Sequence, residues 1–238
     1  MNENKTFESS QVKIGNWWFP FDDKKCRRHF EEKGLQIDHL EKALERVTDW
    51  SLAVDGGAHV GSWTRILAGC FKRVAAYEMA PDTFACLKKN TADLKNVRLV
   101  NAAIGHKRGR AGVNDVGHTL GRCVAEGDQV PMLRLDDENL EALGFLKLDL
   151  EGYEYFGLKG AERAIRRFRP VILVEEKGHG QRYEVAAGAT TEFLESLGYI
   201  HVFRMKPDNL FVPGSRNPIA AFFQKKKFKL ARKIKSRC

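Results

Sequence analysis

The sequence predicts an α/β protein with a doubly wound, mainly parallel sheet, and three observations lead to this prediction. Short apolar segments alternate with segments of helical periodicity along most of the chain. A glycine-rich turn, VDGGAHVGSWT (54–64), joins the first apolar segment to a helix-like one. A continuous apolar run, PVILV (170–174), is typical of a strand that is covered on both faces. Strands that alternate with helices in this way form parallel sheets with helices on both sides.

The individual elements follow in a regular order after an aromatic N-terminal segment. Residues 1–35 are irregular, and NWWFP (16–20), with Trp17, Trp18 and Phe19, predicts an arm or lid over the core. Apolar positions with helical spacing predict helices at 36–47, 63–71, 81–94, 155–168 and 191–198. Apolar or alternating runs predict strands at 51–54, 73–78, 96–105, 129–135, 145–150 and 170–176. The Gly-rich segment 106–128 predicts strands or loops, and 199–205 with 218–224 predict a closing antiparallel hairpin around a long loop.

The composition is that of a soluble globular protein whose excess charge lies at one end. The chain has 238 residues, 43% of them hydrophobic and 30% charged, and its formal net charge is +9. Residues 225–238 contain eight Lys or Arg and no acid, so the rest of the chain is nearly neutral. This basic tail would bind nucleic acid or an anionic surface, or would be only a solvated terminus. We expect an arm at 1–35, one domain at 36–224 and the tail at 225–238.

Cysteine usage and the absence of targeting signals predict a cytoplasmic protein. The five cysteines are scattered and form no C-x-x-C pair, which argues against a zinc site or a disulfide framework. The polar N-terminus MNENKTFESSQ lacks the pattern of a secretory signal. No apolar run approaches the about 18 residues of a membrane-spanning helix, so we expect no transmembrane segment.

The turn at 55–61 predicts a ligand site. Ligands of open α/β sheets bind beyond the carboxyl ends of the strands, and glycines allow the backbone to approach them closely. The turn reads D-x-G-x-x-x-G and lacks the G-x-G-x-x-G fingerprint of dinucleotide-binding proteins. Its leading acid, Asp55, would repel a pyrophosphate but suits a ligand with a positive amine, such as S-adenosylmethionine. The alternative is a plain turn between a strand and a helix.

Glu78, at the end of the second predicted strand, is a candidate ribose ligand. It follows Asp55 by 23 positions, and dinucleotide folds place an acid at about this distance to bind both ribose hydroxyls. The alternative is a surface acid in front of a helix.

The segment FLKLDLEGYE (145–154) predicts a charged end of a central strand. Lys147, Asp149 and Glu151 share one parity, so they would project to one side of an extended chain. Asp149 would contact the cofactor, position the acceptor, act as a general base or bind a metal. The alternative is an ion pair of Lys147 with Asp149 or Glu151 that only organises the turn.

The loop EEKGHG (175–180), which follows the apolar run, offers further candidates. His179 would accept a proton from an acceptor hydroxyl, because an imidazole titrates near neutral pH. An exposed loop histidine without a role is the alternative. Glu175, together with Asp149, is a candidate ligand of a divalent metal.

Together, these segments resemble the FkbM family of S-adenosylmethionine-dependent methyltransferases. The similar stretches lie within residues 51–176 and are VDGGAHVGSWT, YEMAPDTFACLKKN, VRLVNAAIG, FLKLDLEGYEYFGLKGAERAI and RPVILVEE. The resemblance implies a Rossmann-like, seven-stranded sheet whose last strand is antiparallel. It also implies a cofactor site formed by Asp55, Gly56, Gly57, Ala58, Gly61, Glu78, Met79, Ala102 and Ala103. Asp149 and Glu151, in the K-x-D-x-E-G motif, and His179 would form the catalytic face.

The resemblance implies O-methylation of a hydroxyl on a sugar or another small-molecule or glycan acceptor. One alternative is a nucleic-acid methyltransferase that uses the basic tail, although the N/D-P-P-Y motif of amino-methylating DNA enzymes is absent. A second alternative is a non-catalytic binding module, because a fold does not determine a function.

Overall fold

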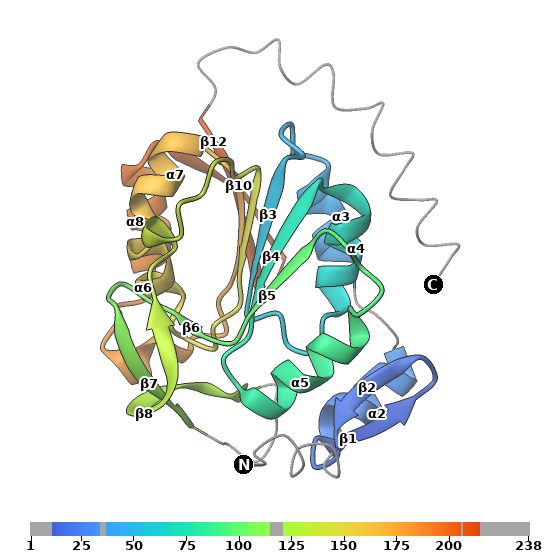
Figure 1. The fold of residues 1–238 in the computed structure, drawn as a ribbon. Helices are drawn as coiled ribbons and strands as arrows, with labels where there is room; N and C mark the ends of the chain where they lie inside the picture. Colours follow the sequence, from blue (N-terminus) through green and yellow to red (C-terminus); the bar gives the residue numbers. More distant parts are fainter. Residues whose placement is uncertain (1–10, 34–36, 115–120, 206, 215–238) are drawn as a thin grey trace.

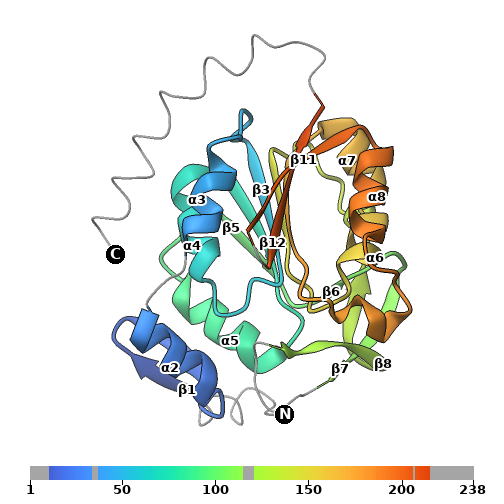
Figure 2. The ribbon, with the colours of Figure 1, turned by 180° about the vertical axis from the view of Figure 1, so that it is seen from behind.

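A seven-stranded sheet lies at the centre of the molecule, and helices cover both of its faces (Figures 1 and 2). The computed structural model describes residues 11–33, 37–114, 121–205 and 207–214. In order across the sheet, the strands are β11 (Tyr199–Met205), β12 (Asp208–Pro213), β10 (Val171–Glu175), β9 (Phe145–Leu148), β3 (Leu52–Gly56), β4 (Arg73–Tyr77) and β5 (Val97–Val100). Strands β10, β9, β3, β4 and β5 are parallel, and β12 is antiparallel to both of its neighbours. The predicted fold class is therefore confirmed.

Side chains of the central strands alternate between two apolar cores, as the period of a strand requires. Helices α3 (Asp38–Leu44), α4 (Ser62–Cys70) and α5 (Pro81–Asn90) lie on one side of the sheet, and α6 (Glu154–Lys159), α7 (Glu162–Phe168) and α8 (Ala189–Ser196) on the other (Figure 1). Ala53 and Phe145 pack with Leu40 and Leu67 of α3 and α4. Val54 and Leu146, the next residues along these two strands, pack on the other face with apolar side chains of α6, α7 and α8. Burial on both faces explains why these strands are short and almost wholly apolar.

The closing hairpin differs from its prediction. Strand β11 pairs with β12, which lies within the predicted long loop, and residues 218–224 are outside the described part of the chain. Leu210 and Phe211 of β12 are fully buried, but the strand begins with the polar residues Asp208 and Asn209. This polar start conceals a buried strand from an analysis of apolar runs.

Two predicted elements are divided in the structure. The helix predicted at 155–168 forms α6 and α7, which separate at Gly160. A Cβ on Gly160 would lie 1.9 Å from the carbonyl oxygen of Gly105, so only a glycine allows this close approach of the two segments. The strand predicted at 96–105 forms β5 and a short strand, β6 (Ala103–Ile104), which belongs to a second sheet.

The second sheet has three strands and lies beside the end of the main sheet. It contains β6, β8 (Cys123–Leu133) and β7 (Gly109–Asn114) in that order. Strand β8 starts six residues before the predicted strand at 129–135, within the segment for which strands or loops were predicted. Figure 1 shows β7 and β8 at the lower left, below the main sheet.

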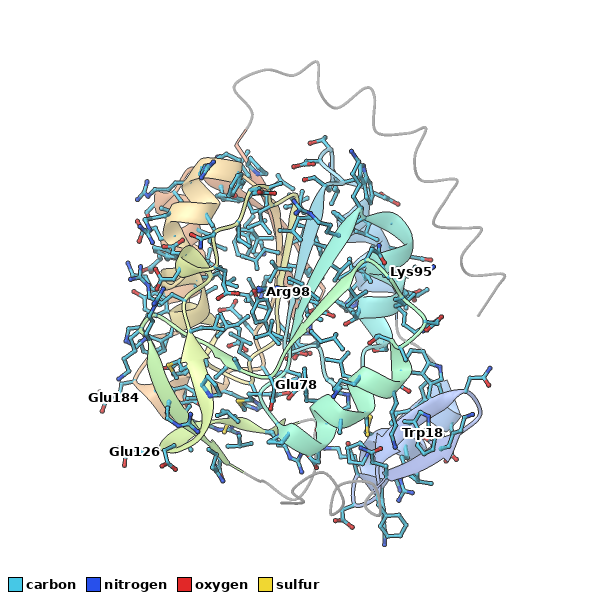
Figure 3. The ribbon with its side chains drawn as sticks, viewed as in Figure 1. Trp18, Glu78, Lys95, Arg98, Glu126 and Glu184 are labelled. Carbon is cyan, nitrogen blue, oxygen red and sulfur yellow. The ribbon has the colours of Figure 1, made fainter. Side chains whose placement is uncertain are left out.

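The N-terminal module, residues 11–33, is regular rather than irregular. It contains β1 (Gln11–Ile14), β2 (Trp17–Pro20) and α2 (Lys24–Lys33), so the prediction of an irregular segment is wrong for these residues. Ile14 pairs with Trp17 across a two-residue turn in which Gly15 has φ +56°. A glycine at the first position of such a turn is typical of a β-hairpin. The hairpin lies against α5, with Trp18 labelled at its edge in Figure 3.

Asn90, at the end of α5, connects the N-terminal module to the rest of the protein by hydrogen bonds. Its Nδ2 donates to the carbonyl oxygens of Trp18 and Val60 at 2.9 and 2.8 Å, and its Oδ1 accepts from the Trp18 amide at 2.7 Å. The Asn90 side chain is buried, and its bond to Val60 is fully buried, whereas the two bonds to Trp18 are partly buried. The module is thereby held beside the glycine turn that Val60 belongs to.

Replacing Asn90 with alanine is expected to lower the free energy of unfolding by about 2–4 kcal/mol, because a buried side chain loses three hydrogen bonds. It should also make residues 11–33 the first site of limited proteolysis. Asn96→Ala is the matched control, since Asn96 donates to Ala68 and Phe71 at 2.9 and 3.0 Å, away from the module. Urea unfolding and mass spectrometry of the fragments measure both effects. Equal cleavage in the two variants would contradict the role of Asn90.

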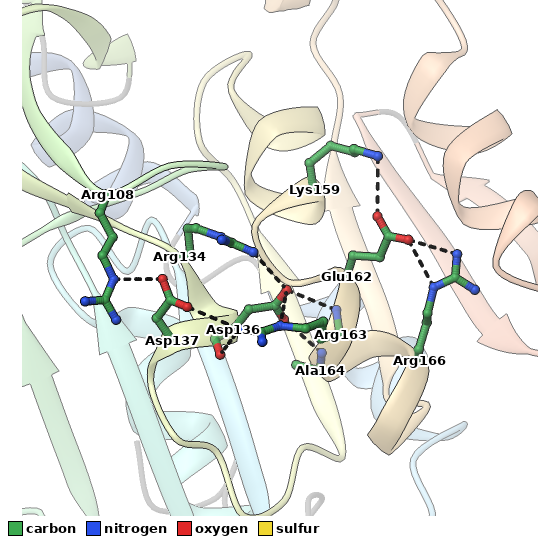
Figure 4. A network of polar contacts seen from close by, with 9 residues as sticks. All are labelled: Arg108, Arg134, Asp136, Asp137, Lys159, Glu162, Arg163, Ala164 and Arg166. Carbon is green, nitrogen blue, oxygen red and sulfur yellow. Dashed lines mark hydrogen bonds and ion pairs between the residues drawn. The ribbon is translucent and has the colours of Figure 1, made fainter.

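A polar network joins the end of β8 to the start of α7 (Figure 4). Asp136 accepts the amide protons of Arg163 and Ala164 at 3.1 and 2.9 Å, which satisfies two free N–H groups of the first turn of α7. Arg108 Nε donates to Asp137 at 2.8 Å. The second sheet is therefore connected to the helices on one face of the main sheet.

The helices of the described residues are all too short or too polar to cross a bilayer.

Candidate active site

A cavity of about 730 Å³ lies at the carboxyl ends of β3, β4, β9 and β10. The chain leaves β3 toward β4 on one side and returns to β9 on the other, so the crevice between β3 and β9 is the topological switch point. Most of the predicted site residues line the cavity. They are Gly57, Ala58, Glu78, Met79, Ala102, Ala103, Asp149, Glu151 and Glu175. Asp55, Gly56, Gly61 and His179 are not among its lining residues.

Gly57 allows the turn after β3 to lie directly against the turn after β9. Its φ is +73°, and a Cβ at this position would lie 1.8 Å from the carbonyl oxygen of Asp149. The amides of Gly57 and Ala58 both donate to the carbonyl oxygen of Tyr77, at 3.0 and 2.9 Å. The turn is therefore fixed to the ends of β4 and β9, and only a glycine fits at its centre.

Asp55 lies behind the turn and is paired with Lys147. The two residues are opposite each other in β3 and β9, and Asp55 Oδ1 lies 3.2 Å from Lys147 Nζ. Thr64 Oγ1 donates to the other carboxylate oxygen at 2.6 Å, and Lys147 Nζ donates to the carbonyl oxygen of Gly57 at 2.6 Å. Burial opposes the charge of Lys147, but Asp55 and then Asp149 outweigh it and raise the pKa of the ammonium. Asp55 thus holds the turn from inside the protein.

Glu78 ends β4 with both carboxylate oxygens directed by backbone amides. Oε2 accepts from the amide of His59 at 2.9 Å, and Oε1 accepts from the amide of Ala80 at 2.8 Å. Burial raises the pKa of Glu78, while His59 and these two hydrogen bonds oppose the shift. Figure 3 shows Glu78 between the end of β4 and the start of α5.

Three carboxyl groups form an acidic edge at the ends of β9 and β10. Asp149, Glu151 and Glu175 each offer an oxygen within 4.8 Å of the others, so the set could hold a divalent cation. The Nζ of Lys177 already lies 2.7 Å from both Glu151 and Glu175. Glu151 has φ +53° and reaches the edge through a turn, because β9 ends at Leu148. The prediction that Lys147, Asp149 and Glu151 project to one side of an extended chain therefore does not hold after Leu148. Lys147 Nζ and Asp149 Oδ2 nevertheless lie 3.8 Å apart.

Asp149 and Glu175 differ in protonation at neutral pH. Burial, followed by the neighbouring Asp149, raises the pKa of Glu175 to about 9. Burial also opposes ionisation of Asp149, but Lys147, Glu175 and Lys177 outweigh it and lower the pKa of Asp149. At pH 7 Asp149 is therefore ionised, and Glu175 carries a proton.

This proton gives a testable pH dependence of stability. Glu175 has a higher pKa in the folded protein, about 9, than its ordinary value of 4.5, so unfolding releases the proton between these values. Its contribution to stability is complete below about pH 4.5 and is lost as the pH rises through about 9. Between about pH 6 and about pH 9, the free energy of unfolding should fall less in Glu175→Gln than in the wild type. Urea titrations measure this, with exposed Glu126→Gln as control; parallel profiles would contradict the assignment.

His179 lies behind the acidic edge. It begins a short 3-10 helix, η3 (His179–Tyr183), and its Nδ1 is 3.0 Å from Glu151 Oε2.

The structure also places on the cavity a histidine that the sequence analysis did not single out. His39 Nδ1 lies 2.5 Å from Asp208 Oδ2, and both residues line the cavity. Because 169 positions separate the two residues, no local pattern could have joined them.

The N-terminal module and the second sheet form the remaining walls. Trp17, Phe19 and Phe30 line the cavity from the module, whereas Trp18 is outside it. Arg122, which precedes β8, and Val124, near the start of that strand, line the cavity from the second sheet. The cavity therefore has an apolar wall that faces a charged edge.

The order of the strands and the turn at their switch point define a Rossmann-like fold with a ligand crevice. The family profile described as "Methyltransferase FkbM domain" matches residues 55–201, which is more than half of the chain. The chain therefore belongs to the FkbM family of S-adenosylmethionine-dependent methyltransferases, as the sequence predicted.

Solved structures with a similar fold are distant from this chain. An FkbM methyltransferase from Methylobacillus flagellatus KT is 20% identical, with a TM-score of 0.47 over 68% of this chain and 43% of that one. An rRNA methylase from Streptococcus thermophilus is 16% identical, with a TM-score of 0.47 over 74% and 94%. Aeropyrum pernix fibrillarin, solved with S-adenosyl-L-methionine, is 14% identical, with a TM-score of 0.40 over 70% and 67%. The chain thus spans less than half of the Methylobacillus protein. Among curated proteins, none matches the chain significantly.

Proposed function

We propose that the protein transfers the methyl group of S-adenosylmethionine to a hydroxyl of a sugar or another small-molecule or glycan acceptor. The observation that carries the proposal is that one cavity joins the glycine turn, Glu78 and the acidic edge. Its volume of about 730 Å³ lies within the range of about 300–1,000 Å³ that is typical of ligand sites.

The cofactor would occupy the part of the cavity at the ends of β3 and β4. Gly57 and Ala58 would contact its methionine end, because both line the cavity and neither has a side chain larger than a methyl group. Each oxygen of Glu78 accepts one amide proton and has a further lone pair, so the carboxylate suits two ribose hydroxyls. Met79, with Ala102 and Ala103, would form the apolar surface for the adenine.

The acceptor would lie near the acidic edge. Ionised Asp149 can accept a hydrogen bond from a hydroxyl and would in this way orient an oxygen nucleophile. When bound, S-adenosylmethionine supplies an electrophilic methyl group. A divalent cation at Asp149, Glu151 and Glu175 would lower the pKa of a bound hydroxyl. Lys177 already places a positive charge beside two of these carboxyl groups.

Calorimetry with S-adenosylhomocysteine tests the cofactor half of the proposal. Glu78→Gln is expected to weaken binding about 10- to 100-fold, which corresponds to the loss of a charged hydrogen-bond acceptor. Glu126→Gln makes the same change of charge at an exposed position on β8, far from Glu78 in Figure 3, and should leave affinity unchanged. Equal affinities of the two variants would refute this role of Glu78.

Mass spectrometry tests the acceptor half. The full-length protein is incubated with isotopically labelled S-adenosylmethionine and a panel of sugars, sugar nucleotides and oligosaccharides. We expect one labelled methyl group on an oxygen of a panel member. Label on nitrogen or carbon, or none on any hydroxyl compound, would contradict O-methylation of this acceptor class.

A nucleic-acid acceptor is the second candidate, favoured by the eight basic residues of the tail, 225–238. The tail lies outside the described residues, so its partner, nucleic acid or an anionic surface, stays a prediction. Binding that weakens steeply with salt and requires the tail would favour this candidate.

A further inference from the structure

We propose that His39 is the general base of the methyl transfer and that Asp208 positions it. The inference rests on the proposed function, since it assigns the group that takes the proton from the acceptor hydroxyl. It is carried by the contact between these two residues and by their place on the cavity wall.

The contact fixes which nitrogen of His39 is available. Nδ1 lies 2.5 Å from Asp208 Oδ2, and an ionised carboxylate can only accept a hydrogen bond, so Nδ1 carries the proton. Among the described residues, Nε2 has no hydrogen-bond partner, and the His39 side chain is 32% exposed at the cavity. A neutral imidazole with Nδ1 protonated has its free lone pair on Nε2. This is the arrangement that a general base requires, with a carboxylate to orient the ring.

Asp208 belongs to the same row of carboxyl groups as the acidic edge. It lies directly opposite Glu175 in the pairing of β12 with β10. Asp149 follows Leu148, which lies opposite Val174, so Asp149 ends the next strand along. Side chains of directly opposed residues are about 5 Å apart at Cβ. His39, on α3, contacts the last carboxyl group of this row.

The charges around the pair support this placement. Burial raises the pKa of Asp208, while the hydrogen bond and the charge of His39 lower it. The charge of Asp149 also raises the pKa of Asp208, and that of Lys147 lowers it, so both groups lie within electrostatic range. An imidazolium formed at His39 would be stabilised by the carboxylate beside it.

The other histidines near the site fit the role less well. His179 does not line the cavity, and its Nδ1 faces Glu151. His59 lines the cavity, and its Nε2 lies 3.8 Å from the buried Asp23. The backbone amide of His59 is bound to Glu78, which places this residue at the ribose end of the cofactor site.

The proposed step is balanced without a further reactant. The acceptor oxygen forms a bond to the methyl carbon while the bond from that carbon to sulfur breaks, and its electron pair stays on sulfur. The hydroxyl proton moves to Nε2 of His39, which becomes an imidazolium beside Asp208. Release of this proton to water restores the base.

NMR tests the base without an acceptor. In nitrogen-15 spectra of the full-length protein at neutral pH, His39, assigned from the signal lost in His39→Gln, should show a protonated Nδ1 and an unprotonated Nε2. Asp208→Asn should shift the proton toward Nε2, because the carboxylate that holds Nδ1–H is gone. A protonated Nε2 in the neutral wild-type ring would overturn the proposal. Spectra with and without S-adenosylhomocysteine separate this result from a failure of cofactor binding.

Kinetics with the acceptor found by mass spectrometry tests the same point. His39→Gln should lower kcat about 10²- to 10⁴-fold, the usual contribution of a general base, with unchanged affinity for S-adenosylhomocysteine. Added imidazole should restore part of the activity of His39→Ala. His106→Gln is the control, since His106 is an exposed histidine that lies against the ring of Phe156 and does not line the cavity. Unchanged kcat in His39→Gln, or loss of its cofactor affinity, would overturn the assignment.

Discussion

Replacing Lys147 with methionine is expected to lower the free energy of unfolding by about 3–5 kcal/mol, the usual cost of breaking a buried ion pair. Asp55 is fully buried opposite Lys147, so within the described part of the chain the variant leaves its carboxylate with the hydroxyl of Thr64 as its one remaining side-chain partner. The carbonyl oxygen of Gly57 also loses its donor. Urea unfolding followed by circular dichroism at neutral pH measures the loss.

Two further variants show whether the uncompensated charge is the cause. The double variant Lys147→Met with Asp55→Asn should recover part of the stability, because no charge then remains buried and unpaired. Lys95→Met removes a lysine from the exposed position labelled in Figure 3 and should change stability by less than about 0.5 kcal/mol. A double variant that is no more stable than Lys147→Met would show that the charge of Asp55 is not the cause.

Gly57→Ala is expected to abolish measurable binding of S-adenosylhomocysteine and to destabilise the fold. The new Cβ would lie 1.8 Å from a backbone oxygen of Asp149, so the turn must move away from the end of β9. The positive φ adds about 1–2 kcal/mol for a residue with a side chain. Calorimetry and thermal unfolding measure the two effects.

Gly15→Ala is the control that separates the cost of a positive φ from the effect of the steric clash in Gly57→Ala. Gly15 also has a positive φ, +56°, but a Cβ there meets nothing within 4 Å. This variant should show only the conformational cost and should keep its affinity for S-adenosylhomocysteine. If Gly57→Ala bound the ligand as tightly as Gly15→Ala, the close approach of the two turns would have no role in the cofactor site.

The central sheet could be predicted because its signals are local. The run PVILV and the turn VDGGAHVGSWT each carry a complete pattern within a few residues. The hairpin of residues 11–20 also had a local signal, the Gly15–Asn16 pair between the alternating segment QVKI and the aromatic segment WWFP, which the apolar runs alone did not reveal. Strand β12 lacked such a signal because its first residues, Asp208 and Asn209, are polar.

The site could be predicted only as far as its motifs extend. The glycine turn, Glu78 and Asp149 lie at strand ends, and parallel strands bring their carboxyl ends to one edge. The inward position of Asp55 depends on the register of β3 against β9, which opposes it to Lys147. The His39–Asp208 contact depends on where β12 enters the sheet. Register and strand order are properties of the whole chain, so neither could be obtained from a local pattern.

The position of β12 also has a consequence for biosynthesis. A nascent chain that ends at residue 205 contains β11 but not β12, which lies between β11 and β10 and forms hydrogen bonds with both. On the ribosome, β11 therefore has no neighbour until the following residues emerge. The glycine turn and Glu78 are synthesised more than 100 residues before Asp208. We infer that the cofactor half of the cavity can form during translation, whereas the wall with His39 and Asp208 is completed only after the last strand has been inserted.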